Sequence, residues 1–209
     1  SWKAHEEAVS TMAISPDGQL IAAGFAVLGD GAVARVWRLD DGAMVHDFIS
    51  DQVRRTSAMT FSPDGRELIV QTGGAKTSRF DLESGTETVI PSVVSSLARR
   101  LDFDSSGTLL LLAGGEVSGI VDISGRRPPR ALARLRTPIV TGGWLDGRTA
   151  AMILSDGMIR VIDTAPDPAL TRATIPASWC FGLAFSPSGS KMAIGVQAAC
   201  IVDLAKPTE

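Results

Sequence analysis

One short turn sequence recurs along this chain. Ser-Pro-Asp-Gly occupies residues 15–18 and 62–65, and looser copies, Asp-Ser-Ser-Gly and Ser-Pro-Ser-Gly, occupy residues 104–107 and 186–189. Serine, proline and glycine at the first, second and fourth positions suit a type I β-turn, because proline fixes φ at the second position. The chain therefore repeats one local structure, which favours a fold built from repeated units.

The spacing of these turns gives the length of the unit. The turn glycines, Gly18, Gly65, Gly107 and Gly189, lie 47, 42 and 82 residues apart. The last interval is close to two units, and a degenerate copy, Trp-Leu-Asp-Gly at residues 144–147, falls midway. We therefore expect five units with a period near 42 residues.

Each unit places apolar runs around its turn in the same order. Short β-rich runs separated by turns indicate antiparallel sheet, and no segment is a convincing helix. The first runs, before the turns, are Val9–Ile14, Ala58–Phe61, Leu97–Phe103, Ile139–Trp144 and Cys180–Phe185. The second runs are Leu20–Gly24, Glu67–Gln71, Thr108–Ala113, Thr149–Leu154 and Lys191–Val196. The third runs are Val33–Leu39, Ser78–Leu82, Gly119–Ile123, Met158–Asp163 and Ala199–Leu204. The weaker fourth runs are Met44–Phe48, Glu87–Ile90, Ala131–Leu135 and Ala169–Ile175.

Composition limits the class of protein. Apolar residues make up 44% of the 209 residues and charged residues 21%, which is typical of a globular chain. The formal net charge of −3 gives no general attraction to nucleic acid or to an anionic membrane. No apolar stretch approaches the roughly 20 residues that span a bilayer. The sequence opens on Ser1 and not on methionine, so a leader or a further domain can precede it.

Four strands per unit at this period resemble the WD-repeat β-propeller family. The third runs end where that family has its Trp-Asp pair, and the segment Ser155–Asp163 is the best match. The aspartate is present in four units and the tryptophan in one. The pairs here are Trp37-Arg38, Phe80-Asp81, Val121-Asp122, Ile162-Asp163 and Val202-Asp203. The family's Gly-His before the first strand occurs only as Ala4-His5, so we expect its His–Asp network to be absent and packing to fix the blades.

The resemblance implies an all-β propeller of four-stranded antiparallel blades. Propellers have about four to eight blades, and five are visible here. The fifth stops after its third strand, so we expect an incomplete ring, or one that a further chain or further blades complete. An unpaired strand would expose backbone groups that invite pairing. The expected blades cover residues 4–49, 50–92, 93–135, 136–176 and 177–209.

The two cysteines, Cys180 and Cys200, predict free thiols. They fall on the first and third strands of one blade, about 9.6 Å apart at roughly 4.8 Å per strand. A disulfide needs Cα atoms within about 7 Å. Free thiols fit a reducing compartment, so we expect a cytoplasmic protein. The Ala-, Gly- and Arg-rich composition makes a bacterial source plausible.

Candidate partner-binding residues lie before the first strands, where the family's blades ring the mouth of a central channel. Tryptophan and arginine are the side chains that most often anchor protein partners. The alternative is that the tryptophan caps the core and the arginines are solvated. The candidates are Trp179, Arg55, Arg54, Arg136, Leu97 and Pro138.

The densest charge run is Arg-Arg-Pro-Pro-Arg-Ala-Leu-Ala-Arg-Leu-Arg at residues 126–136. One interpretation is a patch for acidic protein or nucleic acid. The favoured interpretation is a loop followed by the outer strand of a blade, where charge blocks edge-to-edge aggregation.

Enzyme signatures fail one by one. Ser188–Lys191 matches Ser-x-x-Lys but lies in a repeat turn, and Gly73–Thr77 lacks the Gly-Lys pair of a phosphate loop. His5 and His46 are the only histidines, and no cluster has zinc-ligand spacing. We therefore expect no enzyme, no cofactor and no metal.

The resemblance implies a non-catalytic scaffold whose loops bind partner proteins or peptides. Two alternatives stay open. One is a structural subunit whose open terminal blade docks permanently onto another chain. The other is a propeller that binds a ligand, or is enzymatic, at the channel mouth, which needs convergent polar residues in the first strands. Only Arg99, Arg100 and Asp102 qualify there.

Overall fold

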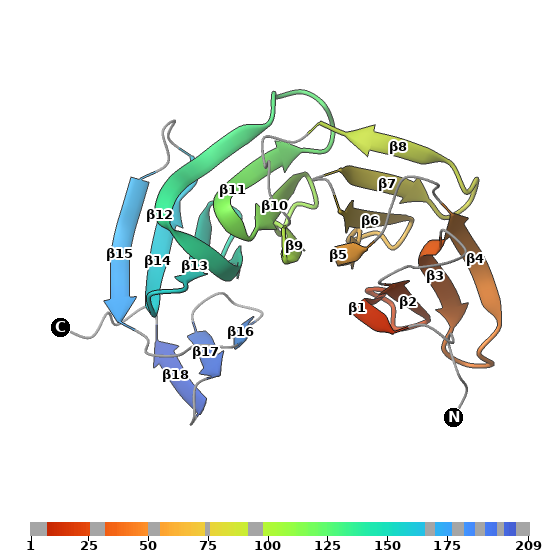
Figure 1. The fold of residues 1–209 in the computed structure, drawn as a ribbon, viewed down its shortest axis with the longest axis horizontal. Helices are drawn as coiled ribbons and strands as arrows, with labels where there is room; N and C mark the ends of the chain where they lie inside the picture. Colours follow the sequence, from red (N-terminus) through yellow and green to blue (C-terminus); the bar gives the residue numbers. More distant parts are fainter. Residues whose placement is uncertain are drawn as a thin grey trace. The chain divides into compact units, whose positions relative to one another are not determined.

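The fold consists of antiparallel sheets in two compact units, residues 1–101 and 102–209 of a computed structural model (Figure 1). The structure describes residues 8–25, 32–49, 55–73, 76–91, 98–165, 170–176, 182–186, 191–195 and 199–203. Strands and turns account for these ranges, and no helix occurs in them. The expected all-β class is confirmed.

The first unit contains two four-stranded sheets whose strands pair in chain order. Each sheet is a meander, because each strand pairs with the next one along the chain through a short turn. The first sheet is formed by β1 (Val9–Ile14), β2 (Leu20–Phe25), β3 (Ala32–Arg38) and β4 (Met44–Ile49). The second is formed by β5 (Thr56–Phe61), β6 (Glu67–Thr72), β7 (Thr77–Asp81) and β8 (Glu87–Ile90). All eight strands contain or overlap the runs expected from the sequence.

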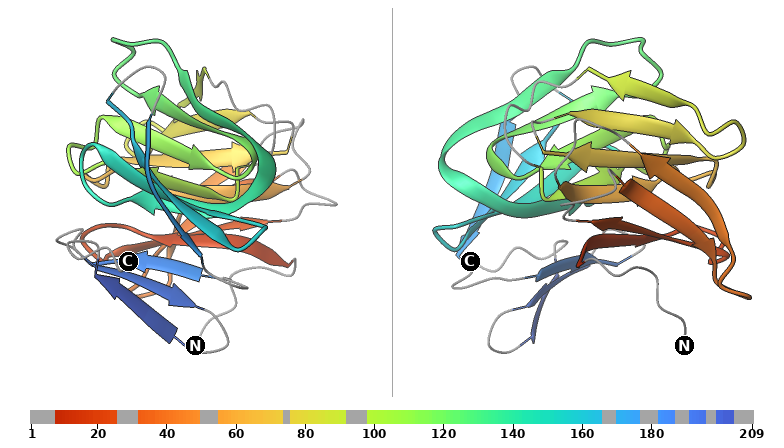
Figure 2. Two further views of the ribbon diagram at one scale, coloured as in Figure 1. Left: turned by 90° about the vertical axis from the view of Figure 1, so that its left-hand side faces the viewer. Right: turned by 45° about the vertical axis from the view of Figure 1, so that its right-hand side comes forward.

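The two sheets of the first unit pack face to face (Figure 2). Their inner faces carry aliphatic and aromatic side chains. Burying these side chains against each other stabilises the fold by roughly 25 cal/mol per Å² of apolar surface. Gly24 lies where β2 approaches β5, because a Cβ there would lie 2.6 Å from Thr56 Cγ2. The buried core is Ala22, Val33, Ala34, Val36, Phe48, Met59, Phe61, Leu68, Val70 and Phe80.

The second unit contains a seven-stranded sheet and a three-stranded sheet. Both are antiparallel meanders, in agreement with the expected strand order. The larger sheet runs from β9 (Arg100–Phe103) through β10 (Leu109–Ala113), β11 (Gly115–Asp122), β12 (Arg130–Trp144), β13 (Thr149–Leu154) and β14 (Met158–Asp163) to β15 (Leu170–Pro176). The smaller is formed by β16 (Gly182–Phe185), β17 (Lys191–Gly195) and β18 (Ala199–Asp203).

One expectation about strands is wrong. The runs Ala131–Leu135 and Ile139–Trp144 were expected to be two strands, but they form the single strand β12. Its first part pairs with β11 and its last part with β13, and Ile139 has a partner on both sides. The strand curves strongly along its length (Figures 1 and 2). It therefore passes from the outside of one repeat to the inside of the next without an intervening loop.

Within the second unit a polar link joins two repeats. The Asp102 carboxylate accepts the Trp144 backbone N–H at 2.9 Å, and the Asp102 carbonyl accepts the Trp144 indole N–H at 3.1 Å. These residues stand 42 positions apart, one repeat period. Trp144 also belongs to the buried core of this unit, so packing and hydrogen bonding fix the same contact.

The repeated turn has the geometry expected of it. The Gly18 N–H donates to the Ser15 carbonyl at 2.9 Å, and the Gly65 N–H donates to the Ser62 carbonyl at 2.8 Å. Both glycines have φ near +70°, which residues with a Cβ rarely adopt. Glycine at the fourth position is therefore a backbone requirement of each turn.

Candidate binding surfaces

The aspartates of the repeated turns are hydrogen-bonded within their own turns. The Ser15 hydroxyl donates to Asp17 at 2.5 Å, and the Gln19 N–H donates to the same carboxylate oxygen at 3.0 Å. Asp64 accepts equivalent bonds from the Ser62 hydroxyl at 2.6 Å and the Arg66 N–H at 3.1 Å. The bonds from the serines, and then those from the backbone, lower the pKa of both carboxyls. These aspartates stabilise turns and are not poised as general acids.

The aspartates of the Trp-Asp positions also close turns. Asp81 accepts the Ser84 N–H at 2.7 Å, and Asp122 accepts the Ser124 N–H at 2.9 Å. Arg38 stands at the equivalent position of the first repeat, where its guanidinium pairs with Asp41 instead. At the Trp-Asp positions these aspartates therefore stabilise the turns that follow the third strands.

Of the candidate partner-binding residues, the structure describes the side chains of two. Arg55 is exposed just before β5, and its carbonyl accepts the Gly73 N–H at 2.8 Å. Pro138 is exposed within β12, and its carbonyl accepts the Ser155 N–H at 2.9 Å. Arg55 belongs to the first unit and Pro138 to the second. Their role in binding stays a prediction.

The other candidates lie wholly or partly outside the described residues. Arg136 is within β12, but its side chain is not described. Trp179, Arg54 and Leu97 lie outside the described residues, as do His5 and Cys180.

The arginine-rich run has the expected backbone. Residues 126–129 form the loop after β11, and Arg130 begins β12. Arg126 and Arg127 are exposed, whereas Arg130 is partly buried. The loop therefore leads directly into β12, the strand that passes from one repeat to the next.

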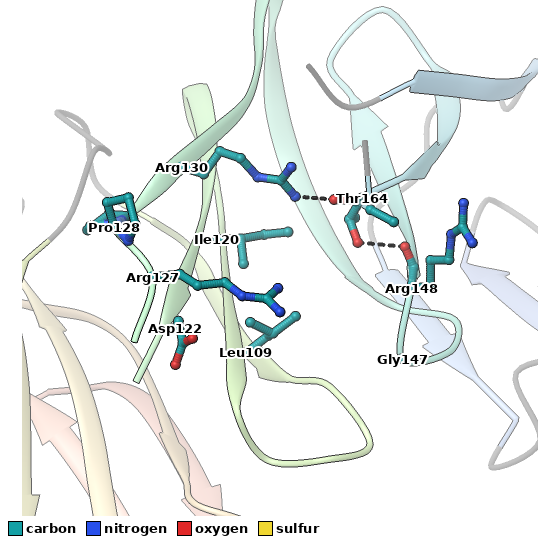
Figure 3. Close-up of a pocket in the computed structure, with 11 residues that line it drawn as sticks. Leu109, Ile120, Asp122, Arg127, Pro128, Arg130, Gly147, Arg148 and Thr164 are labelled. Atoms are coloured by element: carbon teal, nitrogen blue, oxygen red, sulfur yellow. Dashed lines mark hydrogen bonds between the residues drawn. The ribbon is translucent and has the colours of Figure 1, made fainter. Parts of the chain in front are cut away.

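Beside this loop the second unit has a pocket of about 530 Å³ (Figure 3). It lies where the start of β10 and the C-terminal ends of β11 and β14 meet the start of β12 and the turn before β13. We name it the arginine pocket, because three arginines line it. Its lining residues are Leu109, Ile120, Asp122, Arg127, Pro128, Pro129, Arg130, Gly147, Arg148, Thr164 and Ala165.

Thr164 holds the two sides of the arginine pocket together. Its N–H and its hydroxyl both donate to the Arg148 carbonyl, at 2.9 Å and 2.6 Å. Its own carbonyl accepts a hydrogen bond from the Arg130 guanidinium. Thr164 is buried, so these bonds are shielded from water and the pocket wall is well fixed.

The arginines of the pocket differ in their bonding. The Arg148 guanidinium binds the buried Asp163 carboxylate through two bonds of 2.8 Å and 2.9 Å, which raises the pKa of Arg148. In Figure 3 the Arg148 side chain turns away from Arg127 and Arg130, and these two point across the pocket toward the segment of Thr164. Arg130 and Arg148 are therefore both bonded into the frame of the pocket, and the Arg127 guanidinium lies along it.

The sequence did not reveal this pocket. It marked Arg127 and Arg130 through the density of charge, but it gave no signal for Arg148 or Thr164, which lie in a later repeat. A signal was available in the period. Residues one repeat apart at equivalent strand ends come close together, so the end of β14 could have been matched to the loop after β11.

The described ranges contain neither a metal-binding cluster nor a membrane-spanning helix. In them no group of three or more histidine, cysteine, aspartate or glutamate side chains is arranged to hold a metal ion. No helix in these ranges has the length and apolar character needed to cross a membrane.

Comparison with known proteins places the first repeat. Residues 1–38 match the family model described as WD domain, G-beta repeat. The match ends on the Trp37-Arg38 pair of β3. A comparison with curated proteins found no match. Proteins with WD repeats generally mediate contacts between proteins and are typically non-catalytic. Residues 1–38 therefore carry a WD repeat, and the repeated antiparallel meanders of the chain are consistent with WD-repeat propeller blades.

Proposed function

We propose that this protein is a non-catalytic scaffold that binds partner proteins or peptides through the connections between its strands. The observation that carries the proposal is the WD repeat at residues 1–38, continued by sheets of the same meander order. Rigid sheets hold exposed connections in fixed positions, and such connections are where binding residues concentrate. Its location is proposed to be the cytoplasm, where its two cysteines would stay reduced.

The bonding of the carboxylates supports a non-catalytic role. An acid–base catalyst needs a carboxyl group within reach of substrate, with a pKa tuned toward the working pH. The carboxyls of Asp17, Asp64 and Asp81 have pKa values lowered by serine hydroxyls and backbone N–H groups in their own turns. They are therefore engaged in structure and shifted away from the direction that general acid catalysis needs.

The proposed binding residues precede the first strands of the proposed five blades, some of them in each unit. Arg55 supports this proposal, since its side chain is exposed just before β5 while its carbonyl is fixed by Gly73. Because its backbone is already fixed, binding a partner orders only its side chain. The proposed binding residues are Trp179, Arg55, Arg54, Arg136, Leu97 and Pro138.

The test is selection of binding peptides from a random display library on the immobilised chain, followed by calorimetry with the purified peptides. We expect 1:1 binding that weakens about tenfold in Arg55→Ala and in Trp179→Ala, as for anchor residues. Arg66→Ala is the matched control, because Arg66 is an exposed arginine in a repeat turn of the same unit. Failure to enrich any binding peptide would contradict the scaffold role. Equal weakening by all three variants would contradict the proposed binding residues.

A further inference from the structure

We infer that the arginine pocket binds a carboxylate on an acidic segment of a partner protein. The inference rests on the proposed scaffold function and adds a second site to it, in a different part of the fold from the candidate residues before the first strands.

Arg127 is the main anion-binding group of the pocket. Its side chain is exposed, and the part of the chain that the structure describes holds no ion-pair or hydrogen-bond partner for it. In Figure 3 its guanidinium lies along the pocket beside Leu109, with Ile120 between it and Arg130. Arginine presents a planar fork of N–H donors that matches a carboxylate. Arg127 therefore supplies a donor group directed into the pocket.

The charges around the pocket favour a single carboxylate as ligand. Arg148 is paired with Asp163, and Asp122 is the one carboxylate among the lining residues. Of the three lining arginines, this leaves one positive charge in excess. One excess charge matches the single negative charge of a carboxylate, whereas a phosphoryl group carries about −1.5 to −2 at neutral pH. The net charge of −3 on the whole chain also opposes binding to the backbone of nucleic acid.

The size and composition of the pocket suit a peptide segment. A volume of about 530 Å³ is in the range of small-ligand sites and exceeds what one carboxylate fills. Leu109 and the buried Ile120 supply an apolar wall, and Pro128 and Pro129 form part of the rim. The pocket thus fits an acidic residue together with an aliphatic neighbour of a peptide in extended form.

The test uses a fluorescein-labelled heptapeptide, Ser-Leu-Asp-Glu-Leu-Asp-Ser, and the same peptide with Asn and Gln in place of its acids. Binding to the full chain is followed by fluorescence anisotropy at low and at moderate salt. We expect the acidic peptide to bind and Arg127→Glu to weaken binding at least tenfold, since a charge-assisted contact is replaced by repulsion. Arg127→Lys should weaken it about threefold, because lysine keeps the charge and loses the fork.

Arg126→Glu is the matched control. It makes the same change of charge at the neighbouring exposed residue, which does not line the pocket, and should weaken binding less than about twofold through long-range electrostatics alone. Equal weakening by the two Glu variants would overturn the inference, as would equal binding of the amide peptide. Displacement of the acidic peptide by a phosphorylated heptapeptide or an oligonucleotide at lower concentration would also overturn it.

This outcome is independent of the test of the scaffold function. If displayed peptides bind through Arg55 and the acidic heptapeptide does not bind, the pocket inference fails and the scaffold function stands. If neither kind of peptide binds, both fail. Arg127→Glu and Arg126→Glu should unfold at the same temperature as the wild type, because both side chains are exposed.

Discussion

At the scale of single residues, the repeated turn combines three devices that depend on one another. In the second repeat Gly65 supplies the positive φ, and Asp64 accepts from the Ser62 hydroxyl and from the backbone. The Ser62 hydroxyl also accepts the Glu67 N–H at 3.0 Å, which ties the turn to the start of β6. A serine at the first position is thus a bridge between the turn and the strand after it.

Ser62→Ala is expected to lower the free energy of unfolding by about 1–2 kcal/mol, because it leaves the Glu67 N–H without its partner. Guanidinium denaturation followed by circular dichroism measures the change. Ser105→Ala is the control, since Ser105 is exposed in the equivalent turn of the third repeat, and it should change stability by less than about 0.5 kcal/mol. Equal losses in both variants would refute the role given to the Ser62 hydroxyl.

Acid is expected to remove the contribution that ionised Asp41 makes to folding stability. The side-chain hydrogen bond from Arg38 is the main cause that lowers the pKa of Asp41 from 3.8 to about 2. The folded state therefore binds this proton less tightly than the unfolded state, so stability rises with pH across this range. The contribution is complete above a pH of about 3.8 and is lost as the pH falls through about 2.

The measurement is the thermal unfolding temperature of the wild type and of Asp41→Asn as a function of pH. We expect the variant to unfold at a lower temperature than the wild type near neutral pH, and the difference to disappear by about pH 2. A difference that stays constant over this range would show that the charge on Asp41 makes no contribution.

At the scale of strands and sheets, specific contacts fix neighbouring repeats to one another. In the first unit the Ser10 hydroxyl donates to the Thr56 carbonyl at 2.7 Å, and the Thr56 hydroxyl donates to the Val33 carbonyl at 2.6 Å. In the second unit Asp102 and Trp144 make the equivalent link. These bonds join strands of adjacent repeats, so polar pairs assist the packing within each unit.

Asp102→Ala is expected to destabilise the second unit by about 1–3 kcal/mol, because it leaves the buried Trp144 N–H without an acceptor. Asp102→Asn keeps an acceptor oxygen and should cost less. Guanidinium denaturation monitored by tryptophan fluorescence compares the two variants. Equal losses would indicate that the charge of Asp102, and not the acceptor, makes the contribution.

Gly24→Ala is expected to destabilise the first unit by about 1–3 kcal/mol through overpacking. The added Cβ would lie 2.6 Å from Thr56 Cγ2 and 2.7 Å from Met59 Cε, so the two sheets would have to separate. Gly73→Ala is the control, because its nearest atom is 3.7 Å away and the contact is ordinary. Thermal unfolding followed by circular dichroism measures both variants. A Gly24→Ala protein as stable as the control would contradict the close approach of the sheets.

The sequence predicted most strands because turn chemistry and apolar runs act locally. The runs Val9–Ile14, Thr149–Leu154 and Met158–Asp163 have the same bounds as β1, β13 and β14. It failed at β12, where the runs Ala131–Leu135 and Ile139–Trp144 were expected to be separate strands with Pro138 just before the second. Proline lacks the N–H of a ladder bond, but Pro138 lies beside Ile139, where β12 changes its partner from β11 to β13. This change depends on pairing with distant strands, which a local pattern does not encode.

At the scale of the whole molecule, the fold and partner binding depend on different features of the sequence. The period predicted the order of the strands, because every repeat carries the same turn. The arginine pocket could not be predicted in the same way, since Arg130 and Thr164 are brought together by strand pairing across 34 residues. Recognition by a repeat protein depends on what differs between repeats, and a repeat pattern shows only what they share.

In the proposed scaffold, sheets that are already fixed carry connections that bind partner proteins. Hydrogen–deuterium exchange with and without a bound display-selected peptide is the measurement to make, because exchange reports each segment separately. Exchange should slow in the connections before the first strands, while β6, β10 and β13 are equally protected in both states. Protection that rises throughout those strands on binding would show that the partner orders the sheets and that they are not a preformed scaffold.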